Sequence, residues 1–104
     1  MTPFSPKIED EVAGDVDEEI VEPPMYKVVF LNDDYTTMEF VVEVLMLVFH
    51  KSIQQATAIM LDVHTNGRGV CGIYAREVAE AKVQAVHTLA HERDFPLKCI
   101  MEKE

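Results

Sequence analysis

The sequence predicts a small α/β sandwich of the α+β kind, in which three helices pack against a three-stranded antiparallel sheet in the order βααβαβ. Two observations predict it. Three short, largely apolar runs have the character of strands, and three longer stretches carry apolar residues at helical spacing. A chain of 104 residues that alternates in this way forms one domain around one core.

The first 24 residues differ from the rest in charge. They contain eight acidic residues and one basic residue (−7), whereas the other 80 residues contain eleven acidic and eight basic residues (−3). We expect residues 1–24 to be a flexible acidic N-terminal extension and residues 25–104 to be the folded core. One alternative is a transient helix gripped by a partner, since an apolar residue recurs at every fourth position: Phe4, Ile8, Val12, Val16 and Ile20.

The composition argues against several classes of protein. A net-negative chain without a basic stripe is a poor binder of nucleic acid or anionic membranes. The sequence has no run of about 18 apolar residues that would span a membrane, and its start lacks the pattern of a secretory signal. Cys71 and Cys99 lie in apolar contexts and are expected to be buried free thiols. We therefore expect a cytoplasmic protein. We also expect a monomer that holds no metal or cofactor.

The first strand and helix are predicted from residue type and spacing. Residues 26–31 (YKVVFL) are rich in β-branched and aromatic residues and predict a strand. Residues 37–49 carry apolar side chains at helical spacing. Thr36 and Glu39 have the spacing of a capping box, in which each side chain binds a free amide at a helix start.

The second helix has clear signals at both ends. Ser52 and Gln55 form a second capping box, and Asn66-Gly67 provides a stop. The spacing places five residues on one side of this helix: Ile53, Ala56, Met60, Val63 and His64.

The last three elements follow in the order strand, helix, strand. Residues 69–74 predict a strand, residues 76–91 a helix, and residues 97–101 a closing strand after Pro96. The third helix is expected to bury Ala79, Val83, Val86 and Ala90 and to expose Glu77, Glu80, Lys82, Gln84, His87 and His91.

The polar residues Asn32, Asp33 and Asp34 lie between the first strand and the first helix. They are typical of a turn, but three hydrogen-bond acceptors in a row also suit a cation site beside an apolar floor. A calcium loop is not expected, because the following residues lack the required oxygen ligands. His64, near the end of the second helix, is either a partly buried histidine or a further acceptor.

These residues suggest a socket between the first two helices. If the helices pack through Met38 and Val41 against Met60 and Val63, then Asn32 and His64 flank an apolar hollow. An α-ammonium followed by a bulky apolar side chain would suit both parts. The sequence therefore favours recognition of a polypeptide N-terminus.

Catalytic interpretations have less support. Cys71 and His64 would need to share an open cleft to act as nucleophile and base, and His87 and His91 lack the acids of a zinc-protease motif. Two alternatives stay open. One is a small metal-dependent hydrolase that uses Asp33, Asp34 and His64, and the other is an assembly domain whose acidic arm binds a basic partner.

Several stretches together resemble the ClpS family across about residues 25–104. They are YKVVFLNDDYTTMEFV (26–41), AIMLDVH (58–64), VCGIY (70–74), EVAEAKV (77–83) and PLKCIMEK (96–103). The resemblance implies a non-enzymatic adaptor of the N-end rule pathway. Such an adaptor binds N-degron proteins, which begin with Leu, Phe, Tyr or Trp, and delivers them to the N-domain of a ClpA-type AAA+ unfoldase of the ClpAP protease.

The resemblance also implies roles for particular residues. Asn32, Asp34 and His64 would receive the α-amine, with Asp33 adjacent. The side-chain pocket would comprise Leu31, Thr36, Met38, Val41, Met60, Val63 and Leu97. Met38 would exclude β-branched first residues, Glu77 and Lys82 would contact the unfoldase, and the unfoldase would engage residues 1–24 during delivery.

Overall fold

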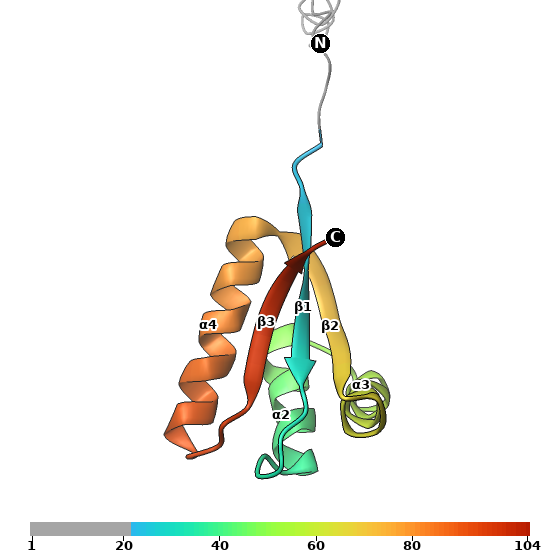
Figure 1. Ribbon diagram of the computed structural model, residues 1–104, viewed down its shortest axis with the longest axis vertical. Helices are drawn as coiled ribbons and strands as arrows, with labels where there is room; N and C mark the ends of the chain where they lie inside the picture. Colours follow the sequence, from blue (N-terminus) through green and yellow to red (C-terminus); the bar gives the residue numbers. More distant parts are fainter. Residues whose placement is uncertain (1–21) are drawn as a thin grey trace, which may run out of the picture.

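The computed structural model describes residues 22–104. The predicted flexible extension, residues 1–24, lies outside the described residues except for its last three positions. The described elements are β1 (Met25–Leu31), α2 (Met38–Phe49), α3 (Ile53–Asn66), β2 (Arg68–Ala75), α4 (Arg76–Glu92) and β3 (Lys98–Lys103), which confirms the predicted order (Figure 1).

The sheet is built on β1. Its strand order is β2-β1-β3, and both neighbours run antiparallel to the central strand, as predicted. Three consecutive residues of β1, Val28, Val29 and Phe30, are completely buried. Because side chains alternate along a strand, Val28 and Phe30 point into the core formed with the helices, whereas Val29 points to the opposite face of the sheet.

A β-bulge adjusts the pairing of β1 with β2. Val28 faces Gly72 and Val29 faces Val70, so that Cys71 is the extra residue of β2. Cys71 is buried in the core. The bulge thus lets β2 present both Cys71 and Gly72 on the core side of the strand.

The cap at the start of α2 differs from the prediction. The N-cap is Thr37, whose hydroxyl accepts a hydrogen bond from the amide of Phe40 at 3.1 Å. Thr37 has the extended backbone of an N-cap residue, and Thr36 lies one position too early to reach the first free amides of the helix. The proposed Thr36–Glu39 capping box is therefore wrong.

The signals for α3 are confirmed at both ends. Ser52 and Gln55 make both hydrogen bonds of a capping box. Gly67 ends the helix in the left-handed conformation at φ 88°, which glycine adopts without strain. Ile53 is an exception to the predicted apolar side, because it is exposed at the first helical residue and the buried contacts begin one turn later, at Ala56.

Gly69 is the point where β2 passes closest to α3. A β-carbon there would lie 2.8 Å from a methyl of Val63 and 3.0 Å from the carbonyl oxygen of Ile59. The second contact is with backbone, which does not move aside easily. This close approach explains the glycine that the sequence shows at the start of the strand.

Gly69→Ala is therefore expected to destabilise the fold by about 1–3 kcal/mol, as overpacking usually does. Chemical denaturation followed by circular dichroism measures the change. Gly72→Ala is the comparison and should cost less, because the three atoms nearest to its β-carbon, at 2.4–2.7 Å, all belong to the side chain of Tyr74, and a side chain yields more easily than backbone. Equal denaturation midpoints for Gly69→Ala and the unchanged protein would contradict the expectation.

Candidate functional site

The loop between β1 and α2 is fixed to the end of α3. The backbone amide of Asn32 donates a hydrogen bond of 3.0 Å to the carbonyl oxygen of Gly67. This bond joins the residue that follows β1 to the residue that ends α3. The loop and the last turn of α3 are consequently held side by side, although they are more than thirty positions apart in the sequence.

Asp33 organises the loop internally. One carboxylate oxygen accepts hydrogen bonds from the amides of Tyr35 and Thr36, both at 2.8 Å, and the other accepts from the Thr36 hydroxyl at 2.7 Å. Burial raises the pKa of the Asp33 carboxyl, but these hydrogen bonds outweigh it and hold the pKa below its usual value. Asp33 is thus the centre of an Asx turn.

A hollow of about 430 Å³ opens between this loop, α2 and α3. Its floor is apolar and closed, because Val41 and Val63 are 5% and 3% exposed, whereas Met38 at its mouth is 45% exposed. The lining residues are Asn32, Asp33, Asp34, Tyr35, Thr36, Thr37, Met38, Val41, Met60, Val63 and His64.

The structure brings together most of the predicted site. Asn32 and His64 lie on one hollow, and α2 and α3 line it through Met38, Val41, Met60 and Val63, as the spacing predicted. His64 is exposed on the last turn of α3 rather than partly buried. Tyr35 and Thr37 also line the hollow and were missed, because a loop has no periodicity that would show which side chains turn inward.

Leu31 and Leu97 do not line this hollow, although both were expected there. Leu31 lies opposite Arg68 and Lys98 in the sheet, and the alternation of β1 turns it to the face away from the helices. Leu97 is buried within the core, next to the start of β3.

The chain matches the family model described as ATP-dependent Clp protease adaptor protein ClpS over residues 21–100. The chain belongs to the ClpS family. A ClpS protein of Desulforapulum autotrophicum is 56% identical over 104 residues, which is the full length of both chains. One of Desulfatibacillum aliphaticivorans is 60% identical over 82 residues, 79% of each chain.

A solved ClpS structure has the same fold. Agrobacterium tumefaciens ClpS2 bound to L-phenylalaninamide superimposes with a TM-score of 0.78 at 40% identity, covering 80% of this chain and 100% of that one. The ClpS relatives are named adaptors rather than enzymes.

Glu77 and Lys82 of this ClpS chain lie on α4, away from the hollow. They line a second depression of about 540 Å³ with apolar residues of α2 and α4. Lys82 is half-buried rather than exposed as predicted, because its ammonium donates a hydrogen bond of 2.6 Å to the carbonyl oxygen of Val48 and lies over the rings of Phe49 and Tyr74.

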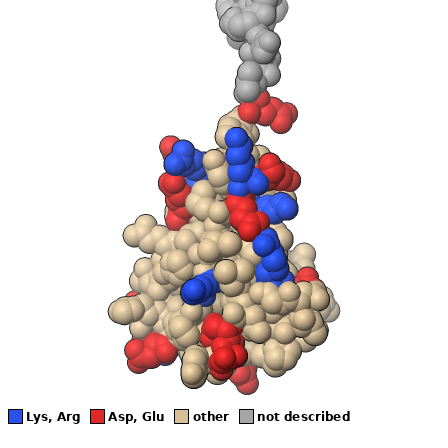
Figure 2. All heavy atoms as spheres, in the orientation of Figure 1, with Lys and Arg blue, Asp and Glu red and all other residues tan. Residues whose placement is uncertain are grey.

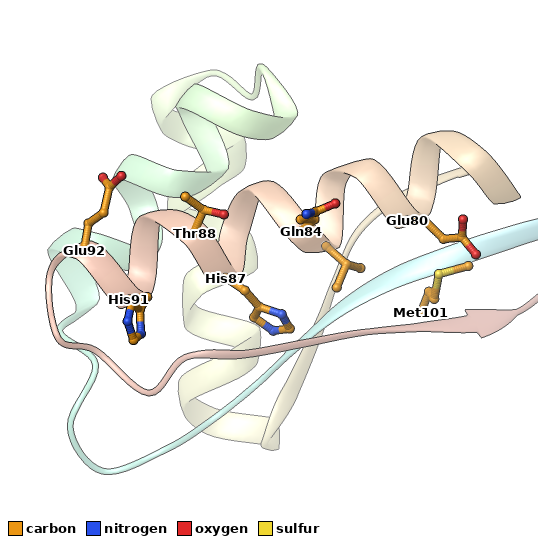
Figure 3. A pocket seen from close by; sticks show the side chains of 8 residues that line it. Glu80, Gln84, His87, Thr88, His91, Glu92 and Met101 are labelled. Atoms are coloured by element: carbon orange, nitrogen blue, oxygen red, sulfur yellow. The ribbon is translucent and has the colours of Figure 1, made fainter.

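A third hollow, of about 790 Å³, runs between α4 and β3. His87 and His91 project from one side of α4 toward it (Figure 3). The Nε2 atom of His87 accepts a hydrogen bond from the amide of Cys99 at 3.2 Å, so that this imidazole joins α4 to β3. Within residues 22–104 no group of three or more His, Cys, Asp or Glu side chains is arranged to hold a metal ion.

Both cysteines are free and buried, as predicted. Burial raises the pKa of the Cys99 thiol to about 12, and burial together with the neighbouring Cys99 raises that of Cys71 even further. Neither thiol is prepared to act as a nucleophile. In the part of the chain that the structure describes, no helix is long and apolar enough to cross a membrane.

Asp33→Ala is expected to release the loop, because it removes three hydrogen bonds to a carboxylate, each worth about 1.5–3 kcal/mol. Amide hydrogen exchange at Tyr35 and Thr36 should accelerate by about tenfold or more, since about 1.4 kcal/mol corresponds to tenfold.

The matched control is Asp34→Ala. The Asp34 carboxylate makes none of the side-chain hydrogen bonds found within residues 22–104, and the exchange of the same two amides should stay unchanged. Equal acceleration in both variants would show that Asp33 has no special role in holding the loop.

Proposed function

We propose that this ClpS chain binds proteins whose first residue is Leu, Phe, Tyr or Trp and delivers them to a ClpA-type AAA+ unfoldase of the Clp protease. The observation that carries the proposal is the composition of the hollow. Polar acceptors from the β1–α2 loop and α3 stand beside a closed apolar floor formed by α2 and α3. Only a ligand with a cation next to an apolar group satisfies both.

The acceptors divide into two kinds. The Asp33 carboxylate is occupied by hydrogen bonds within the loop, and we assign it to shaping the site. Asn32, Asp34 and His64 remain to receive the α-ammonium, directly or through water. L-Phenylalaninamide, bound to the Agrobacterium ClpS2 structure, has this chemistry, since it combines a free α-amine with an aromatic side chain.

The size and energetics of the hollow suit capture followed by release. Ligand pockets in proteins measure roughly 300–1,000 Å³, and the hollow of about 430 Å³ lies within this range. Burying a Leu or Phe side chain contributes about 1.5–3 kcal/mol, and each hydrogen bond to the ammonium contributes about 1.5–3 kcal/mol. With three such hydrogen bonds and an association cost of at least about 4 kcal/mol, the upper ends of these ranges leave about 8 kcal/mol, which corresponds to an affinity near the micromolar range.

The proposal includes the partner and its contact surface. Glu77, with the exposed apolar residues Leu47 and Val78 beside it, would face the N-domain of the unfoldase. Lys82 would stabilise this surface through its hydrogen bond to the carbonyl oxygen of Val48. We also propose that the adaptor acts as a cytoplasmic monomer, and that the unfoldase engages residues 1–24 during delivery.

Peptide binding tests the recognition step. A labelled peptide that begins with Leu or Phe is expected to bind with micromolar or tighter affinity, measured by fluorescence anisotropy. The same peptide with an acetylated N-terminus should bind at least about a hundredfold more weakly, because it loses about 3 kcal/mol of hydrogen bonds to a charged group. If acetylation leaves the affinity unchanged, the hollow does not read the α-amine.

Met38→Ala is expected to admit peptides that begin with Ile or Val, because it removes a side chain that narrows the mouth of the hollow. Their affinity should rise by about tenfold, and the same anisotropy assay measures it. Met46→Ala is the control, since Met46 is a similarly exposed methionine of α2 that does not line the hollow. Continued rejection of Ile and Val peptides by Met38→Ala would remove the gating role from Met38.

Glu77→Lys tests the delivery surface. In this proposal the N-domain surface is complementary to the negative charge of Glu77. A positive charge at this position is therefore expected to weaken binding to the isolated unfoldase N-domain by about tenfold or more, measured by calorimetry. Peptide affinity should not change, because Glu77 does not line the hollow. Glu92→Lys, a charge reversal at the other end of α4, should leave both affinities intact, and an equal loss in this control would show a general effect of net charge.

A further inference from the structure

The proposed function leaves one face of the sheet unused. Within residues 22–104 the three helices pack on the side of Val28 and Phe30, and no described element covers the other side. In Figure 1 the strands accordingly lie in front of α2. The open sheet face consists of Met25, Lys27, Val29 and Leu31 of β1, Arg68, Val70, Ile73 and Ala75 of β2, and Lys98, Ile100 and Glu102 of β3.

This open sheet face is partly apolar. Met25, Val70 and Ile73 are 38%, 41% and 44% exposed, which is high for large apolar side chains. Val29 is fully buried although no helix covers it. Part of the reason is that Arg68 of β2 reaches across the central strand to Glu102 of β3, with 2.6 Å between the charged atoms. The exposed apolar surface therefore lies mainly along β2.

The open sheet face is also positively charged in a chain that is strongly negative. It carries Lys27, Arg68 and Lys98 against Glu102, a net charge of +2, whereas the whole chain carries −10. Figure 2 shows several Lys and Arg side chains over this face, with acidic groups both among them and around its edge. Neither Lys27 nor Lys98 takes part in the ion pairs found within residues 22–104.

We propose that the open sheet face binds residues 1–21 of the same chain. This segment has seven acidic residues and one basic residue, a net charge of −6, and an apolar residue at every fourth position from Phe4 to Ile20. It therefore matches the open sheet face both in the sign of its charge and in its mixture of charged and apolar groups. The partner is an acidic, apolar-containing segment, and the chain itself supplies one.

The connection makes the contact sterically accessible. Residues 1–21 lead directly into β1, whose seven residues span about 23 Å at about 3.3 Å each. Val16 precedes Met25 by nine positions, and nine residues reach at most about 30 Å, which exceeds the length of the strand. Because the two parts are tethered, their effective concentration is on the order of millimolar, and weak ion pairs suffice. Any partner that binds residues 1–21 would first have to displace them from the open sheet face.

Paramagnetic relaxation in the full-length chain tests the contact. Ala13→Cys introduces a thiol for a nitroxide label, and Cys71 and Cys99 should not react, because they are buried. We expect the amide signals of Val70 and Ile73 to lose at least about twice as much intensity as those of Leu47 and Val78 on the helical side. At about 1 M salt, where the screening length is about 3 Å, this difference should disappear. Equal losses on both sides at low salt would overturn the proposal.

Charge reversals separate docking from a general effect of net charge. The Lys27→Glu/Lys98→Glu variant should abolish the difference in intensity loss between the two sides. Arg76→Glu/Arg93→Glu, which changes the net charge equally but at the two ends of α4, should preserve it. If both variants abolish it, the open sheet face is not the binding site. If Lys27→Glu/Lys98→Glu does not fold, a second variant leaves the core unchanged and replaces Glu9, Asp10 and Glu11 with Lys. This variant should remove the difference in intensity loss. If the difference persists, the proposal is contradicted.

A mixing experiment tests whether the bound segment comes from the same chain or from a second copy. Chains that carry the label but no nitrogen-15 are combined with unlabelled, nitrogen-15-enriched chains. Intramolecular docking predicts no loss of intensity at Val70 and Ile73 in this mixture. If the loss at these residues is as strong as in the singly labelled chain, residues 1–21 bind to a second copy instead, and the proposal is overturned.

Discussion

The burial of β1 is the constraint on which the rest of the structure depends. This strand is the central one of three, so both of its edges are paired, and the side chains of Val28, Val29 and Phe30 are fully buried. The helices pack against one face, and the chain leaves the strand at the point where α3 ends. The amide of Asn32, which immediately follows the strand, is held by the carbonyl of Gly67. The candidate site is therefore attached to the fully buried central strand.

The site itself combines fixed and accessible parts. Val41 and Val63 form a floor that belongs to the core, whereas Met38 stands at the rim and is nearly half exposed. Asp33 uses its carboxylate to hold the loop, which leaves the neighbouring acceptors oriented but unoccupied by the loop. A preformed hollow of this kind binds a ligand with little reorganisation.

The two sides of the sheet offer different chemistry. On the helical side, the apolar residues of α2 and α4 surround a depression whose lysine ammonium donates a hydrogen bond to a carbonyl and lies over two aromatic rings. On the other side, basic residues flank exposed valine and isoleucine side chains. The hollow, the depression of α2 and α4 and the open sheet face consist of different residues, so the functions proposed for them do not compete for the same surface.

The sequence by itself determined the elements and their order, because each depends on local signals. Periodicity located the helices, and the Ser52–Gln55 box and Gly67 fixed both ends of α3. The polar residues after β1 and the methionines and valines of α2 and α3 also identified most of the hollow. The misplaced cap at Thr36 shows the limit of local signals, since two adjacent threonines offer the same side chain and only the backbone decides between them.

The tertiary structure decided which side chains meet. Leu31 is apolar and adjacent to the site in sequence, yet the alternation of β1 turns it to the open sheet face. Lys82 was expected on a solvated helix face, but packing of α4 against α2 brings the carbonyl of Val48 within 2.6 Å of its ammonium. Contacts of this kind depend on the relative position of distant elements, and no local pattern in the sequence encodes that position.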